Sequence, residues 1–142
     1  LPGRRITIIG GGQVGCESAL FLAQQGKIVT VIEMQPTVLS DASPSYQSRL
    51  LRNITALGDQ IQLITDARCI SMGAETCYQC ADGTQHTVCS DHVVLAAGMK
   101  PQTELALSLF DPNYEFHMIG DCLQTGNVQK VIRSAYSVAL EV

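Results

Sequence analysis

Three glycines near the amino terminus are spaced as a phosphate-binding turn requires. Positions 10, 12 and 15 form G-x-G-x-x-G, after the β-branched run Arg5–Ile9 and before the helix formers of Val14–Gln25. In such a strand-to-helix turn Gly10 permits the sharp bend, Gly12 leaves the backbone open to a ligand, and Gly15 lets the helix approach the strand. Backbone N–H groups at a helix amino terminus hold anions, so the pattern predicts a site for a dinucleotide pyrophosphate.

An acidic residue stands where such a site would bind the adenosine sugar. Glu33 closes a second β-branched run, Ile28–Ile32, 23 positions after Gly10. Its carboxylate can accept hydrogen bonds from both ribose hydroxyls, whereas a 2′-phosphate there would meet like charge, worth about 4 kcal/mol at 4 Å and an effective dielectric near 20. The nearest downstream arginines are Arg49 and Arg52. We therefore expect NAD(H) rather than NADP(H); the alternative is that Glu33 is only a solvated strand end.

The elements that must position these residues follow an α/β pattern. A strand, a helix and a strand within about thirty residues form a βαβ unit. A loop rich in Ser, Asp and Pro leads to a second helix, Tyr46–Leu57, and a third strand, Ile61–Ile64. Residues 67–90 show short alternating segments and an Asp82-Gly83 turn, which predict a three-stranded antiparallel meander. The fold class is therefore a Rossmann-like parallel sheet, with helices on its faces and a meander.

The last fifty residues predict a final parallel strand and a separate strand-helix segment. Val93–Ala96 is a buried strand that ends before Gly98, Phe116–Ile119 is a short strand, and Val128–Val142 is a helix with one apolar stripe. That helix reaches the last residue without the Gly or Asn that usually ends one, so we expect the chain to be a piece of a larger protein.

The order of these segments is more specific than any one of them. It runs ITIIGGGQVGCESA, VTVIEM, a meander with ADG, VVLAAGMKP, and MIGDC followed by a helix. This order resembles the NADH-binding domain of the pyridine nucleotide-disulfide oxidoreductase superfamily. In detail it is most similar to the C-terminal region of NADH:flavin oxidoreductases of the 2-enoate reductase, 2,4-dienoyl-CoA reductase and trimethylamine dehydrogenase type.

The resemblance implies roles for several residues. Ala97 and Gly98 match a segment beside the cofactor, although a threonine is usual at position 97. Gly120 and Asp121 match a motif that holds the flavin. Glu17 matches an acid near the nicotinamide, and its alternative role is to stabilise the helix dipole. The expected cofactor-binding residues are Gly10, Gly11, Gly12, Gln13, Val14, Gly15, Glu33, Met34, Ala97, Gly98, Gly120 and Asp121. No catalytic or metal-binding residue is assigned.

The same resemblance implies a division of the chain and a function. Residues 1–112 would form the NAD(H)-binding domain, and residues 113–142 would be part of a FAD-binding domain. The protein would pass hydride from NADH to a flavin. No second glycine fingerprint occurs in the 142 residues, so FAD binding is expected only in the complete parent protein, whose flavin and barrel domains would be the partners. The chain alone is expected to be inactive.

Composition excludes several other classes. The net charge of −4 and nine scattered basic residues argue against nucleic-acid binding. No apolar stretch reaches the roughly 18 residues of a membrane span, and the opening LPGRRITIIGGG does not resemble a signal peptide, so we expect a cytoplasmic protein. Homo-oligomerisation and the parent's substrate stay open.

The six cysteines admit two minor alternatives. Cys77 and Cys80 form a C-x-x-C, but in a strand residues three apart face opposite sides, so a redox pair is disfavoured. A zinc-binding interaction module built from Cys77, Cys80, His86 and Cys89 is an alternative function, as is a stand-alone module that senses the NADH/NAD+ ratio. The leading expectation for all six is reduced, partly buried thiols.

Overall fold

A computed structural model describes residues 3–141, which form two compact units divided after Gly98. The first unit contains the glycine turn and is an α/β domain; the second, residues 99–142, contains two short helical turns and one longer helix. The domain boundary expected between residues 112 and 113 stays a prediction.

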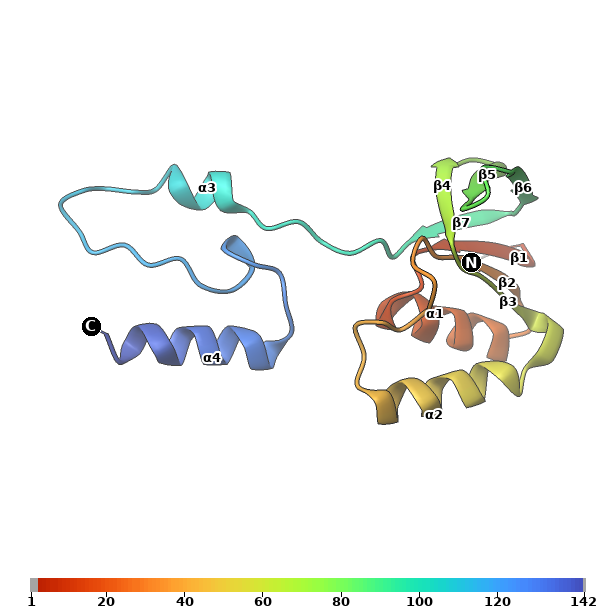
Figure 1. Ribbon diagram of the computed structural model, residues 1–142, viewed down its shortest axis with the longest axis horizontal. Helices are drawn as coiled ribbons and strands as arrows, with labels where there is room; N and C mark the ends of the chain where they lie inside the picture. The colour runs from red at the N-terminus through yellow and green to blue at the C-terminus, as the bar shows by residue number, and fades with distance from the viewer. Residues whose placement is uncertain (1–2, 142) are drawn as a thin grey trace. The chain divides into compact units, whose positions relative to one another are not determined.

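The first unit is built on a four-stranded parallel sheet (Figure 1). Its strand order is β3-β2-β1-β7, which makes β1 and β2 the two interior strands. β-Branched residues favour these strands, because their side chains pack well on a pleated, half-buried surface. The strands are β1 (Arg5–Ile9), β2 (Ile28–Ile32), β3 (Ile61–Ile64) and β7 (His92–Leu95).

Two helices cover one face of this sheet (Figure 1). Helix α1 (Gln13–Gln24) follows β1, and α2 (Pro44–Thr55) leads through the 3-10 turn η1 (Gly58–Gln60) into β3. Successive residues of a strand face opposite sides, so alternate strand residues reach the helices. The buried core on this face includes Ile6, Ile8, Val29 and Val31 of the sheet with Cys16, Ala19, Ala23, Leu50 and Ile54 of the helices.

An antiparallel meander lies on the other side of the sheet from the helices (Figure 1). Its strands are β4 (Ala67–Ser71), β5 (Glu75–Cys80) and β6 (Gln85–Cys89). Gly83 has φ +86° in the β5–β6 turn, as the Asp-Gly pair predicts. Thr7 of β1 and Thr76 of β5 are fully buried. The predicted α/β class and the meander are therefore confirmed.

The second unit contains α3 (Thr103–Leu107), the 3-10 turn η2 (Gly120–Cys122) and α4 (Val128–Ala139). Asn127 caps α4, because its side-chain oxygen accepts the N–H of Lys130 at 3.0 Å. The strand predicted for Phe116–Ile119 is wrong: the segment is irregular, since no described segment pairs with it and an isolated strand leaves its backbone groups unpaired. Among the described residues of this unit no side chain is buried.

The helices of residues 3–141 are all too short or too polar to span a bilayer.

Candidate functional site

The glycine turn joins β1 to α1 at the carboxyl edge of the sheet. Gly10 has φ +106°, in the left-handed region that favours glycine, and its N–H donates to the carbonyl of Ile32 at 2.9 Å. A Cβ on Gly10 would lie 2.4 Å from the Ala96 carbonyl oxygen. The turn is therefore held between β2 and the segment that follows β7.

The space around Gly15 is filled by backbone, whereas the space around Gly12 is open. A Cβ on Gly15 would lie 1.9 Å from the carbonyl oxygen of Gly10, so only glycine allows α1 to pack this close to the turn. A Cβ on Gly12 would meet nothing nearer than the Asp41 carboxylate, at 3.4 Å. Gly12 therefore presents its backbone outward, as the approach of a phosphate requires.

Glu33 lies directly after β2 and is almost fully buried, with 8% of its surface exposed. Its Oε2 accepts the N–H of Gly11 at 2.5 Å, and its Oε1 accepts the N–H of Gln35 at 2.7 Å. The carboxylate therefore fixes the glycine turn against β2. An ionised carboxylate has about four acceptor positions, so two remain for other donors.

The residues expected on either side of the turn lie at the same edge. Met34 follows Glu33 and is exposed. Ala97 and Gly98 follow β7, and the backbone N of Ala97 lies 3.0 Å from the position of a Gly10 Cβ. Gly98 has φ +87°, which a non-glycine residue rarely adopts. The structure thus brings Ala97 next to the turn.

A carboxylate that sequence reasoning missed stands at the amino terminus of α1. The N–H of Gln13 donates to Asp41 Oδ1 at 3.2 Å and to Oδ2 at 3.5 Å, while the N-cap residue Gly12 has no side chain to act as a cap. Asp41 belongs to the exposed part of the β2–α2 loop. An acid in a loop rich in Ser, Asp and Pro gives no sequence signal for this placement, since only the path of the loop decides it.

Glu17 lies one turn into α1. It accepts hydrogen bonds from the Tyr46 hydroxyl of α2 and from Gln13 Nε2, the latter at 3.0 Å. The Tyr46 hydroxyl, followed by the Gln13 amide, holds the pKa of the Glu17 carboxyl below its usual value. Glu17 is therefore oriented by α2, an arrangement that the sequence did not predict.

Gly120 and Asp121 form η2 in the second unit. Asp121 Oδ1 accepts the N–H of Gly126 at 3.3 Å, and the Asp121 carbonyl accepts the N–H of Gln102 at 3.1 Å. Gly120 has φ +64°. These bonds organise a short turn ahead of α4, with the Asp121 carboxylate at its surface.

The meander cysteines form neither a metal cluster nor a disulfide within the part of the chain that the structure describes. Cys77 pairs across the ladder with Thr87, Cys89 with Glu75, and Cys80 with Ala67. The strand register therefore separates these residues. The zinc-module alternative finds no support in residues 3–141.

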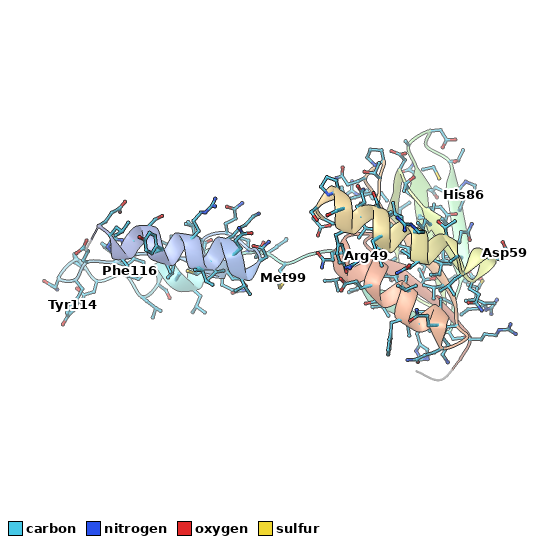
Figure 2. All side chains as sticks on the ribbon, turned by 90° about the horizontal axis from the view of Figure 1, so that it is seen from below. Arg49, Asp59, His86, Met99, Tyr114 and Phe116 are labelled. Atoms are coloured by element: carbon cyan, nitrogen blue, oxygen red, sulfur yellow. The ribbon has the colours of Figure 1, made fainter. Side chains whose placement is uncertain are left out.

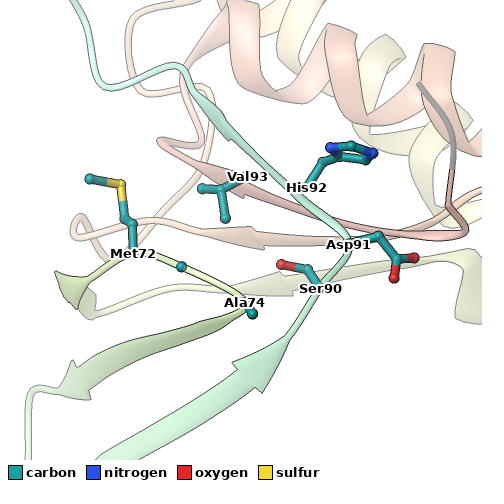
Figure 3. A pocket seen from close by; sticks show the side chains of 7 residues that line it. Met72, Ala74, Ser90, Asp91, His92 and Val93 are labelled. Atoms are coloured by element: carbon teal, nitrogen blue, oxygen red, sulfur yellow. The ribbon is translucent and has the colours of Figure 1, made fainter.

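A shallow pocket of about 440 Å³ lies between the meander and β7, away from the glycine turn (Figure 3). Met72, Ala74 and Val93 give it an apolar wall, and the Ser90 hydroxyl is buried without a hydrogen-bond partner. The Asp91 carboxylate is engaged by the backbone N–H groups of Arg4 and Arg5. Ser90, Asp91 and His92 all line the pocket, but among the described residues no hydrogen bond joins any two of them.

The parallel sheet, the glycine turn and the acid after β2 define a nucleotide-binding domain of the Rossmann type. The model of the pyridine nucleotide-disulphide oxidoreductase family matches residues 1–134, and the chain belongs to this family. The resemblance drawn from the sequence is thereby confirmed.

Individual relatives are much longer than this chain. It is 30% identical over 141 residues to the NADH oxidase of Thermoanaerobacter brockii. That alignment covers 96% of this chain and 21% of the oxidase. It is 34% identical over 147 residues to the cinnamate reductase of Clostridium sporogenes, covering 99% of this chain and 21% of the relative. The chain therefore spans about a fifth of these relatives.

Two solved structures share this fold. A 2-naphthoyl-CoA reductase in complex with 2-naphthoyl-CoA superposes with a TM-score of 0.81 at 25% identity, over 99% of this chain and 21% of that one. Histamine dehydrogenase from Rhizobium sp. 4-9 superposes with a TM-score of 0.80 at 15% identity, over 99% of this chain and 23% of the other. The second likeness concerns the fold alone.

Proposed function

We propose that the first unit binds NAD(H) at the glycine turn and that the chain is the NADH-binding part of a flavin-dependent oxidoreductase. The observation that carries this proposal is the turn itself: a side chain at Gly10 or Gly15 would strike a backbone carbonyl, whereas Gly12 opens outward at the amino terminus of α1. A diphosphate fits such a cradle, because backbone N–H groups and the helix dipole both favour an anion there.

The neighbouring residues supply orientation and selectivity. Glu33 keeps acceptor positions for ribose hydroxyls while it holds Gly11, and its charge opposes a 2′-phosphate. Met34 and Ala97–Gly98 lie at the same edge of the sheet and would flank the bound dinucleotide. The chain's own residues therefore bind and orient the cofactor. Bound NADH supplies the hydride.

The flavin would be held mainly by other parts of the protein. Asp121 and Gly120 would contribute one edge of the flavin site, at the turn before α4. Apolar side chains of the second unit, among them Phe110, Ile132 and Tyr136, are exposed within it, as expected of a segment that packs against flavin and barrel domains. Relatives named as an NADH oxidase and a cinnamate reductase support an oxidoreductase of this kind. This exposed apolar surface favours the flavoenzyme over a stand-alone NADH sensor.

Titration calorimetry with NADH and NADPH tests the proposal. We expect NADH to bind at least tenfold more tightly, and Glu33→Gln to reduce that preference, because the amide no longer repels a 2′-phosphate. Glu75→Gln, at the exposed first residue of β5, removes the same charge away from the turn and should leave the preference unchanged. Equal or reversed affinities in the unmodified chain would refute the assignment of Glu33, and absence of binding would refute the site.

A further inference from the structure

The loop between β2 and α2 is fastened over the glycine turn. The N–H of Leu39 donates to the Gly11 carbonyl at 2.7 Å, and Val38 Cγ1 lies 2.7 Å from the position of a Gly11 Cβ. Leu39 is 1% exposed and has φ +59°, and Gln47 of α2 donates to the Val38 carbonyl at 3.1 Å. Buried contacts therefore fix this part of the loop against the turn.

The exposed part of the same loop places an anion at the amino terminus of α1. Asp41 reaches the Gln13 N–H only through two long contacts, 3.2 and 3.5 Å, and its carboxylate is the nearest group to the open side of Gly12. These two observations, one from hydrogen bonding and one from the space around Gly12, put the carboxylate where a diphosphate would approach the backbone.

The surroundings of this position are already negative. Glu33 lies behind the turn and Glu17 one helical turn further on. Burial, followed by the charges of Asp41, Glu33 and Glu17, raises the pKa of the Cys16 thiol to about 12. A diphosphate would therefore enter against three carboxylates, of which only Asp41 is both exposed and in front of Gly12.

We propose that Asp41 is an internal competitor of the dinucleotide: its carboxylate occupies the phosphate position at the α1 amino terminus and must turn away when the cofactor binds. The inference rests on the proposed NAD(H) site and adds a residue that sets its affinity. Release needs only rotation of an exposed side chain, because Val38 and Leu39 keep the loop backbone in place. Asp41 thus weakens cofactor binding without closing the site.

Asp41→Asn isolates the charge. Asparagine has nearly the same shape and its amide oxygen can still accept the Gln13 N–H, so the variant should fold. We expect NADH to bind about tenfold more tightly, equivalent to about 1.4 kcal/mol. Inorganic pyrophosphate alone should likewise bind the variant more tightly than it binds the unmodified chain. The gain should shrink near 1 M salt, where the screening length falls to about 3 Å.

Asp59→Asn is the matched control (Figure 2). Asp59 is an exposed acid of η1, just before β3. It lies at the amino ends of the parallel strands, whereas the turn lies at their carboxyl ends, and the four residues of β3 span roughly 13 Å between these two ends. It changes the net charge equally, so NADH affinity should stay within about twofold of the unmodified chain. Unchanged or weaker NADH binding by Asp41→Asn, with binding intact in the unmodified chain, would overturn the competitor role alone. Absence of NADH binding in every variant would overturn the NAD(H) site as well.

Discussion

Glu33 and Gly11 are 22 residues apart in the chain and are joined by a buried hydrogen bond of 2.5 Å between Oε2 and the backbone N–H. The second carboxylate oxygen accepts the N–H of Gln35. One acidic side chain therefore fastens the glycine turn to the end of β2, and it does so through hydrogen bonds within the protein alone. This structural role is separable from its proposed role toward the ribose, and each has its own measurement.

Glu33→Gln should destabilise the fold by about 1–3 kcal/mol, because the amide –NH2 would face a backbone donor that is buried and loses its acceptor. Urea unfolding of the first unit measures the effect. Glu75→Gln, at an exposed position, should change the free energy of unfolding by less than about 0.5 kcal/mol. Equal effects of the two substitutions would contradict the structural role of Glu33.

Gly15→Ala should destabilise the protein by about 3 kcal/mol or more, because the new methyl group would overlap the Gly10 carbonyl, which lies 1.9 Å from the Cβ position. Gly73→Ala is the control, since its nearest contact is an ordinary 3.7 Å. Thermal melting of the two variants checks the prediction. If the Gly15→Ala variant had the same melting temperature as the Gly73→Ala control, α1 would not pack against the turn as described.

Gly12→Ala should weaken NADH binding without lowering the stability of the fold. Gly12 has φ −68°, which alanine adopts readily, and its Cβ would meet only the Asp41 carboxylate at 3.4 Å, so stability should change by less than about 1 kcal/mol. The methyl group would nevertheless stand between a diphosphate and the backbone. We expect NADH affinity to fall at least tenfold in calorimetry while the melting temperature holds; retained affinity would place the phosphates elsewhere.

Cys16 should be the least reactive thiol of the folded protein. It is fully buried, and burial, followed by the nearby carboxylates, raises its pKa from 9.0 to about 12. The fold therefore favours the neutral thiol: this contribution to stability is complete below the unfolded pKa of 9.0 and is lost as pH rises toward 12.

Labelling with a thiol reagent near pH 8, read by peptide mass spectrometry, tests this prediction. Exposed Cys89 should react first and Cys16 only after unfolding. Rapid labelling of Cys16 in the native state would contradict its burial against the glycine turn.

The chain expressed alone should bind no flavin through purification, because its 142 residues contain a single glycine fingerprint and the role proposed for Asp121 covers only one edge of a flavin site. Visible absorbance and denaturing extraction measure bound flavin. Stoichiometric flavin in the purified chain would contradict this prediction.

Much of the first unit could be predicted from the sequence because its signals are local. The β-branched runs at Arg5–Ile9 and Ile28–Ile32, the glycine spacing between them and the Asp82-Gly83 turn each follow from the geometry of a few adjacent residues. Glu33 could be placed as well, since the end of a parallel strand is recognisable and neighbouring strands end at the same edge of the sheet.

Tertiary structure alone decided the rest. Phe116–Ile119 has the composition of a strand, yet a strand exists only where a neighbour supplies hydrogen-bond partners, and composition does not show whether one is present. Tyr46 holds Glu17, and Asp41 faces Gly12, across 29 residues each. Such contacts depend on how loops and helices return to the turn, and no spacing in the sequence encodes that path.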